Sequence, residues 1–339
     1  MIIRKLRLLI VQGRPQLLPV SMSVPLAGAL THGITPNGVT IITLLLIGAC
    51  AHLAGFIFND LMDFRLDRMV STRQNSPLIR GEITPKTAFV FALLQFPLAI
   101  VAYRIVLQGT SIGLLTLLAS IICSLIYNRW SKWGRLPRIL PEVALALSIA
   151  LLCMAGVFVA SEEIQSAQVL FCGMVGLVLL FVNSIPSGIK DIATDAQFGA
   201  TSFVLSTGSH VTDDGTLRLS WRLRLYTLVV QSIITGGTIT LMLVYRAEGW
   251  ILVIIPMLLM YAWLHVRQML ITTTLSQFKR NIPFLGGFYN YFAVFLIVWA
   301  TLPALLKIPY LLLLLLVLSF PLIRAYALWQ KRYVPILEK

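Results

Sequence analysis

Long apolar runs separated by short polar segments dominate the chain, and they decide its fold class. A helix that crosses a bilayer needs about 20 predominantly apolar residues, and the 339-residue sequence holds ten such candidates. The candidates cover approximately residues 16–33, 38–58, 86–106, 110–127, 138–159, 167–187, 225–245, 249–268, 284–304 and 308–328. Since these runs do not alternate with polar residues as membrane barrel strands do, the pattern predicts an all-α polytopic membrane protein of about nine or ten transmembrane helices.

The composition supports this prediction and excludes the soluble classes. The chain is 58% hydrophobic and 12% charged, whereas soluble domains average roughly 45–50% and 25%. That is more apolar surface than one soluble core can bury, which excludes a soluble enzyme, a disordered chain and a coiled-coil rod. We expect residues 1–339 to form one integral membrane domain.

The basic residues predict the orientation of the chain in the membrane. With the N-terminus inside and ten spans, 24 of the 27 Lys and Arg residues fall on one side, and only Arg104, Arg246 and Lys307 fall on the other. Basic residues concentrate in cytoplasmic loops, so both termini are expected in the cytoplasm, with the protein in the cell membrane. The same distribution accounts for the net charge of +14 without a nucleic-acid partner.

The aspartates gather in two segments that both belong to the predicted cytoplasmic side. Asp60, Asp63 and Asp67 follow the second span at spacing i, i+3, i+7, and Asp191 and Asp195 follow the sixth at i, i+4. On a helix each set shares one face, where like charges repel and need a compensating cation. Carboxylate oxygens suit Mg²⁺, so these five aspartates are the predicted metal ligands.

The paired motifs resemble a known family. NDxxDxxxD at 59–67 and KDxxxD at 190–195 look like the two aspartate-rich motifs of the UbiA-type superfamily of intramembrane prenyltransferases, and the resemblance covers at least residues 14–208. It implies helices around a central cavity that opens to lipid, with the two motifs as caps facing each other across its cytoplasmic mouth. It also implies Mg²⁺ as cofactor, a prenyl diphosphate substrate and a hydrophobic or aromatic acceptor.

The resemblance assigns roles to residues. It implies a prenyltransferase that ionises the diphosphate to an allylic carbocation, with Asp63, Asp191 and Lys190 as catalytic residues, Lys190 neutralising charge on the leaving diphosphate. The residues expected to bind substrate are Asn59, Arg73, Arg80, Tyr127, Lys132, Arg14 and Asn183. The chain departs from the family at Ser76, where an arginine often begins a turn, and before Lys190, where a tyrosine often stands.

Several alternatives stay open at this point. A UbiA-type terpene cyclase would ionise the same diphosphate without an external acceptor. A transporter is less favoured, because transporters hold ionisable residues near the bilayer midplane, and a non-catalytic scaffold is weaker still. Lys132 could contact lipid headgroups, Asn183 could bond a neighbouring helix, and His52 is placed toward the cavity.

Overall fold

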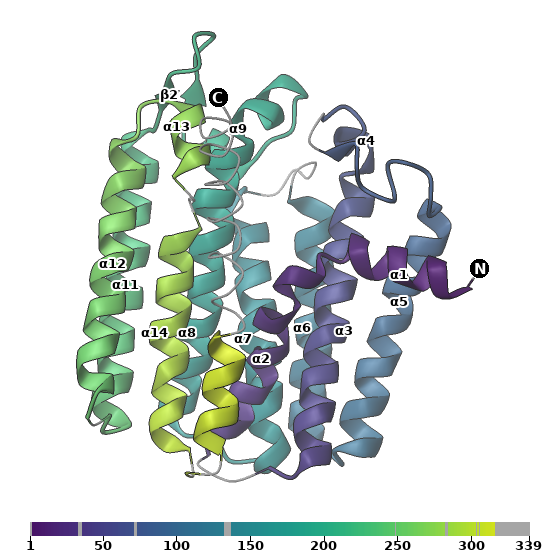
Figure 1. Ribbon diagram of the computed structural model, residues 1–339, viewed down its shortest axis with the longest axis vertical. Helices are drawn as coiled ribbons and strands as arrows, with labels where there is room; N and C mark the ends of the chain where they lie inside the picture. The colour runs from purple at the N-terminus through teal and green to yellow at the C-terminus, as the bar shows by residue number, and fades with distance from the viewer. Residues whose placement is uncertain are drawn as a thin grey trace, which may run out of the picture.

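The computed structural model describes residues 2–32, 36–70, 73–131, 137–247, 249–281, 284–302, 304 and 306–315. Its long helices stand side by side in one bundle, as the apolar runs predict (Figure 1). In chain order the bundle elements are α2 (Leu18–Leu30), α3 (Gly38–Met62), α5 (Pro85–Val101) with the π-helical turn η3 (Ala102–Val106), α6 (Ser111–Trp130), α7 (Ile139–Ala160), α8 (Ser166–Val182), α11 (Trp221–Val244), α12 (Ile251–Ile271) and α14 (Leu285–Thr301).

The remaining elements are short and mostly occupy one end of the bundle. The N-terminal helix α1 (Ile2–Gln12) and the 3₁₀ turn η1 (Pro15–Leu17) precede α2. At the upper end in Figure 1 lie α4 (Phe64–Asp67), α9 (Gly188–Gln197), α10 (Phe203–Ser206), the hairpin β1 (His210–Val211) and β2 (Leu217–Arg218), and α13 (Leu275–Arg280). We call this the motif end, because both aspartate motifs lie on it.

Seven of the predicted spans are helices long and apolar enough to cross a membrane within the described ranges. Two others are shorter than predicted, and one is described only in part. The segment predicted at 16–33 forms a helix of only 13 residues, α2, and the ninth forms the 17-residue α14. The tenth is an apolar helix over Leu306–Leu315, and its predicted remainder, 316–328, lies outside the described residues.

Polar caps fix where several of these helices begin. A side-chain oxygen just ahead of the first turn accepts a backbone N–H three residues later, which satisfies a donor that the helix leaves open. This occurs at Asn37 before α3, Thr84 before α5, Thr110 before α6 and Ser220 before α11. The sequence thereby marks the start of a helix as well as its apolar length.

The prediction of an all-α chain misses one small hairpin. β1 and β2 pair antiparallel, with His210 opposite Arg218. The turn between them contains Asp214, which accepts hydrogen bonds from Thr212 and Thr216, and these bonds lower the pKa of Asp214 to about 2. Gly215 follows at φ +81°, a conformation that glycine adopts without strain. The segment is a turn, as Asp213-Asp214-Gly215 predicts.

The interior of the bundle is held by close backbone contact and by one buried amide pair. Gln231 on α11 and Asn290 on α14 are both 0% exposed. Each donates to the other, at 3.0 and 2.7 Å. Such reciprocal bonds satisfy polar groups that lipid cannot, so Asn290 joins two helices.

Gly28 allows α2 to approach α7 closely. A Cβ atom at Gly28 would overlap the carbonyl oxygen of Cys153, whereas one at Gly173 would meet no atom within 4 Å. We expect Gly28→Ala to lower stability by at least about 1–3 kcal/mol, as overpacking does, and Gly173→Ala to leave it unchanged. Thermal unfolding in detergent measures both, and equal melting temperatures for the two variants would contradict the close-contact explanation.

Candidate active site

The first motif lies at the motif end of α3 and just beyond it. Asp60 belongs to α3, Asp63 ends it, and Asp67 belongs to α4. The backbone N–H of Asp67 still donates to the carbonyl oxygen of Asp63, at 2.8 Å, so helical bonding continues across the break. The three aspartates are 3%, 6% and 8% exposed, which agrees with the shared face that the spacing predicts.

The second motif lies on α9, which continues α8 through one π-helical turn, η4 (Asn183–Ser187). The continuous helix from Ser166 to Gln197 has 32 residues. At 1.5 Å per residue it is about 48 Å long, longer than the roughly 30 Å hydrocarbon core. Asp191 and Asp195 therefore lie at a helix end that extends past the apolar layer, and Asp195 is only 2% exposed.

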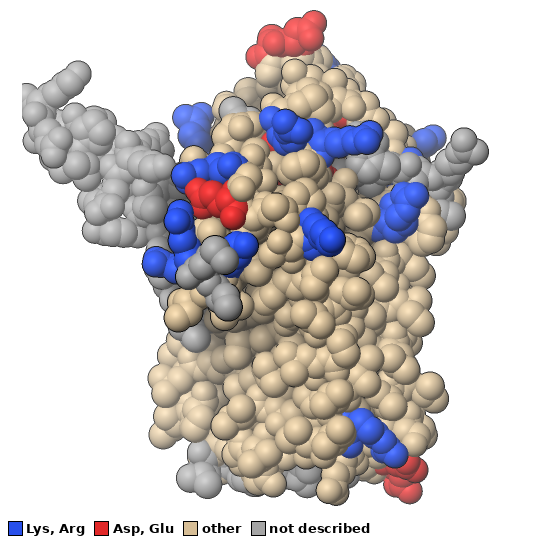
Figure 2. Space-filling model, turned by 90° about the vertical axis from the view of Figure 1, so that its right-hand side faces the viewer, with Lys and Arg blue, Asp and Glu red and all other residues tan. Residues whose placement is uncertain are grey.

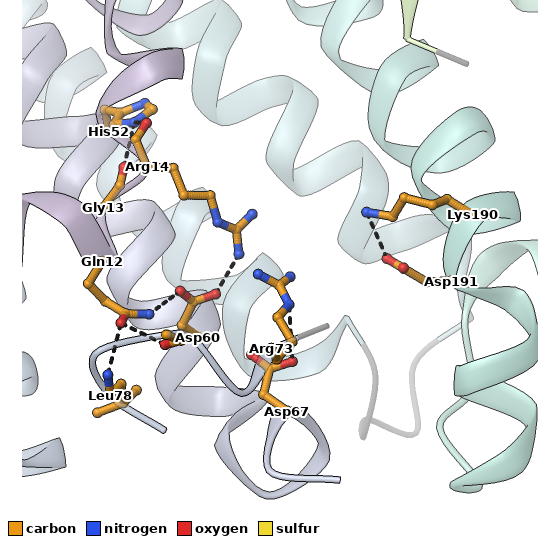
Figure 3. A network of polar contacts seen from close by, with 11 residues as sticks. Gln12, Gly13, Arg14, His52, Asp60, Asp67, Arg73, Leu78, Lys190 and Asp191 are labelled. Atoms are coloured by element: carbon orange, nitrogen blue, oxygen red, sulfur yellow. Dashed lines mark hydrogen bonds and ion pairs between the residues drawn. The ribbon is translucent and has the colours of Figure 1, made fainter. Parts of the chain in front are cut away.

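The structure brings both motifs to the same end of the bundle (Figure 1). In Figure 3, Arg14 of the N-terminal segment and Arg73 of the loop after the first motif lie on the side of the first motif that faces α9, and Lys190 extends from α9 toward them. Arg14 and Arg73 lie within electrostatic range of Lys190. Three cations therefore point into the space between two carboxylate-bearing segments, which is an arrangement suited to a polyanion.

Asp60 is held by two residues from the N-terminal segment. Arg14 Nη2 lies 2.5 Å from Asp60 Oδ1, and Gln12 Nε2 donates to Asp60 Oδ2 at 2.5 Å (Figure 3). The amide oxygen of Gln12 also accepts from Ser76 Oγ, at 2.8 Å, and from the Leu78 backbone N–H, at 3.1 Å. Gln12 thus ties the first motif to the turn after it, a role that the sequence pattern did not indicate.

The backbone at Arg14 adopts the left-handed conformation, with φ +55° and ψ +63°, which is uncommon for a residue other than glycine. His52 stabilises it: Nε2 donates to the carbonyl oxygen of Gly13 at 2.8 Å, and Nδ1 accepts from Ser21 Oγ at 2.9 Å. His52 is 3% exposed. Its two ring nitrogens therefore bond the turn at Gly13 and helix α2, and the expectation that His52 faces the cavity stays a prediction.

The other predicted substrate-binding residues divide into two groups. Arg73 lies 3.6 Å from Asp67, and Asn59 lies half-buried on α3 beside Asp60. Arg80 instead pairs with Glu82 at 2.7 Å with 57% of its side chain exposed, so the structure does not bring it to the motifs. Lys132 lies outside the described residues.

Tyr127 and Asn183 meet in a second polar group, deeper in the bundle. Asn183 Nδ2 donates to Tyr127 Oη at 3.1 Å and to Glu142 Oε2 at 2.5 Å. Asn183 therefore bonds two neighbouring helices, α6 and α7. Glu142, 8% exposed, was not predicted as a site residue, because its place in the sequence resembles an ordinary acid at the start of a helix.

The donor set fits a Mg²⁺ ion in its chemistry. All five motif aspartates supply hard oxygen ligands of the kind that Mg²⁺ prefers, and four of them are buried. In the described residues, however, no three His, Cys, Asp or Glu side chains are grouped closely enough to hold a metal. Asp60 and Asp67 are instead drawn to Arg14 and Arg73.

Basic side chains on the surface are concentrated at the same end of the bundle as the two motifs. On the face that carries α1 and α5, Lys and Arg gather toward the motif end, above a broad uncharged band (Figure 2). Ile3, Leu6 and Ile10 of α1 are exposed, and α1 lies across the long helices (Figure 1). An amphipathic helix in this position is typical of one that lies at a membrane interface.

The sequence matches a known protein family over most of its length. The profile of the UbiA prenyltransferase family matches residues 17–288. A curated relative, the polyprenyl transferase dpmaC of Metarhizium anisopliae, is 26% identical over 164 residues, which cover 46% of this chain and 54% of the relative. The chain thus spans about half the length of this relative.

Solved structures share the fold at low identity. A UbiA homologue from Archaeoglobus fulgidus bound to GPP and Mg²⁺ matches with a TM-score of 0.59 and 19% identity, covering 85% of this chain and 99% of the other. The apo structure of a UbiA homologue from Aeropyrum pernix K1 matches with a TM-score of 0.60 and 15% identity, covering 85% and 96%. Both likenesses concern the arrangement of helices.

Proposed function

Because the chain belongs to the UbiA prenyltransferase family, we propose that it is a Mg²⁺-dependent membrane enzyme that transfers a prenyl group from a prenyl diphosphate to a hydrophobic or aromatic acceptor. The observation that carries the proposal is the convergence of Arg14, Arg73 and Lys190 between two aspartate-bearing helix ends. A diphosphate needs cations around its oxygens, and its metal ions need carboxylates. One end of this bundle offers both.

In this proposal each described residue has a task. Asp60, Asp63, Asp67, Asp191 and Asp195 would hold Mg²⁺, which supplies Lewis-acid neutralisation of the diphosphate oxygens. Lys190 and Arg73 bind the diphosphate directly and take up the negative charge that grows on it as the carbon–oxygen bond breaks. The apolar bundle beneath excludes water, which would otherwise quench an allylic cation.

Two features support a cytoplasmic position for this site. The motif end carries α4, α9 and the basic loops between bundle helices, and basic residues favour the cytoplasmic side. The end of α1 lies beside the first motif, because Gln12 donates to Asp60. We propose that both termini and the diphosphate site face the cytoplasm, within one domain formed by residues 1–339.

Metal removal tests the reaction class. Purified protein in detergent is incubated with geranyl, farnesyl or geranylgeranyl diphosphate and a panel of phenols and aromatic acids, and products are identified by mass spectrometry. We expect EDTA to lower diphosphate release at least about 100-fold, the effect of a few kcal/mol of charge stabilisation, and added Mg²⁺ to restore it. Release that persists undiminished in EDTA contradicts the proposal.

The same assay without acceptor separates transfer from cyclisation. A prenyltransferase yields a prenylated acceptor, and at most slow hydrolysis to prenyl alcohol when no acceptor is present. A hydrocarbon or cyclic terpene alcohol formed without acceptor would assign the chain to the cyclase alternative instead.

A further inference from the structure

A cluster of polar side chains outside the two aspartate motifs lies in the bundle next to them. We call it the Glu142 cluster: Tyr127 on α6, Glu142 on α7, Asn183 and Ser184 on η4, and Tyr226 on α11. Asn183 Nδ2 bridges Glu142 and Tyr127, at 2.5 and 3.1 Å. Ser184 Oγ lies 3.1 Å from Tyr226 Oη, and Tyr226 lies within electrostatic range of Glu142. Four helical segments therefore contribute polar side chains to the cluster, and Asn183 makes the direct contact with the Glu142 carboxylate.

The burial of Glu142 calls for an explanation. Among the described side chains no cation lies within ion-pair distance of it, and a buried carboxylate without a cation is costly. An acid in the first turn of a helix gains from the helix dipole, but that gain is available to an exposed side chain as well. The carboxylate of Glu142 instead points inward to Asn183. Buried acids in perturbed surroundings are frequent at functional sites, and a carboxylate is one of the side chains that accept protons in catalysis.

The cluster lies near the diphosphate end and near an apolar groove of the bundle. Asp63 and Arg14 are within electrostatic range of Tyr127, so the cluster adjoins the first motif. An apolar groove of about 150 Å³ runs between α7 and α8, and its lining includes Val143 and Leu180. Val143 is next to Glu142 in the chain, and Leu180 is one helical turn before Asn183. Because these two lining residues are close in the chain to Glu142 and Asn183, a hydrophobic molecule held in the groove would lie near the Glu142 cluster.

We propose that the Glu142 cluster is the acceptor subsite, that Glu142 accepts the proton which the acceptor loses, and that the acceptor is a neutral, hydroxylated ring. This inference rests on the proposed prenyl transfer and extends it. Tyr127, Tyr226 and Ser184 offer hydroxyl groups that can bond those of an acceptor. An acceptor that carries its own carboxylate would meet the charge of Glu142 and would be repelled, since Asp63 and Arg14, which both lie within range of Tyr127, offset each other.

The transfer step balances with Glu142 as the base. The bond between the prenyl carbon and the diphosphate oxygen breaks, and its electron pair leaves with the diphosphate. A π-electron pair of the acceptor ring forms the new carbon–carbon bond. The proton on that ring carbon passes to a carboxylate oxygen of Glu142, the electron pair of the broken C–H bond restores the conjugation of the ring, and solvent later takes the proton from Glu142.

The test uses Glu142→Gln, with Glu163→Gln as its matched control. The glutamine keeps the size of the side chain and an oxygen that can accept from Asn183, and it removes only the basic carboxylate. Glu163 lies exposed in the loop between α7 and α8. We expect E142Q to lose prenyl transfer about 10²–10⁴-fold, the usual contribution of a general base, and to bind farnesyl diphosphate with Mg²⁺ within about threefold of the unmodified protein. E163Q should match the unmodified protein in both.

Acceptor choice provides the second arm. Unmodified protein is given matched pairs of phenols and naphthols with and without a ring carboxylate, for example 1-naphthol against 1-hydroxy-2-naphthoate. We expect transfer to the neutral member to be at least about tenfold faster, a difference of about 1.4 kcal/mol. Preference for the acid, or transfer to neither member while the diphosphate is still ionised, overturns the inference.

The outcomes separate this inference from the proposed function. Full transfer by E142Q, or equal loss of diphosphate binding and of transfer, overturns the role of Glu142 and leaves the prenyltransferase intact. If E142Q does not fold, Glu142→Asp keeps a carboxylate and should recover part of the transfer. Failure of both variants to fold assigns the cluster a structural role and overturns the inference. No Mg²⁺-dependent ionisation by unmodified protein would instead reject the proposed function itself.

Discussion

Replacing Asp191 with asparagine should lower the kcat/KM for prenyl diphosphate about 10²–10³-fold, the scale on which preorganised charge acts in catalysis. The substitution keeps the shape of the side chain and removes its charge. Asp191 is 39% exposed at the side chain and lies 3.3 Å from Lys190, so it stands at the accessible edge of the space between the motifs. The variant should also need a higher Mg²⁺ concentration for half-maximal rate, because one proposed ligand has lost its charge.

The control for this prediction is Asp213→Asn. Asp213 is an exposed aspartate in the β1–β2 turn, outside the proposed site, so the same chemical change there should leave rate and Mg²⁺ dependence unaltered. The measurement is initial diphosphate release against Mg²⁺ concentration for both variants. If D191N and D213N gave the same curves, the second motif would have no part in catalysis.

Replacing Arg14 with methionine should destabilise the protein by up to about 3 kcal/mol. The substitution removes the cation from Asp60, whose side chain is 4% exposed, and breaking a buried ion pair costs more than forming it gains. The expected loss is at the lower end of the usual range, because the Arg14 side chain keeps 24% exposure. The guanidinium also lies 4.8 Å from the centre of the Phe56 ring, and this contact disappears as well.

A double-mutant cycle isolates the pair. Asp60→Asn in the Arg14→Met background should recover stability, because a neutral amide in that position no longer needs a cation and can still accept from Gln12. The two substitutions should therefore show a coupling free energy of about 0.5–3 kcal/mol. Catalytic activity should stay low in the single variant Arg14→Met and in the double variant. Unfolding in detergent measures the cycle, with Arg7→Met on the exposed face of α1 as control. Strictly additive losses would show that Arg14 and Asp60 do not stabilise each other.

Local patterns in the sequence predicted the fold class and the positions of the motifs. Apolar length defines a membrane helix, and spacings of three and four residues define a helical face. Asp60, Asp63, Asp67 and Asp195 are accordingly buried at the ends of their helices. The error at α2 has the same origin, because an apolar run of adequate length does not reveal that Pro15 opens a 3₁₀ turn and that the helix itself begins only at Leu18.

The contacts that complete the site could not be predicted in this way. Gln12 is 48 positions from Asp60, and Glu142 is 41 positions from Asn183. Which polar residue meets which carboxylate depends on how the helices pack, and neither residue belongs to a motif. His52 shows the limit most clearly: its place on α3 indicates a face of the helix, but only the packed structure shows that the N-terminal segment covers that face.

The π-helical turn at Asn183–Ser187 determines the direction in which the side chains of α9 point. In an α-helix each residue advances the direction of the side chains by about 100°, and a π turn takes up one residue more than an α turn. Deleting one residue there, such as Pro186, would rotate Lys190, Asp191 and Asp195 together by about that angle, away from Arg14 and Arg73, while leaving the apolar span intact. The alignment of the two motifs thus depends on the number of residues in this one turn. A one-residue deletion there should therefore lower activity far more than any substitution that preserves the length of the turn.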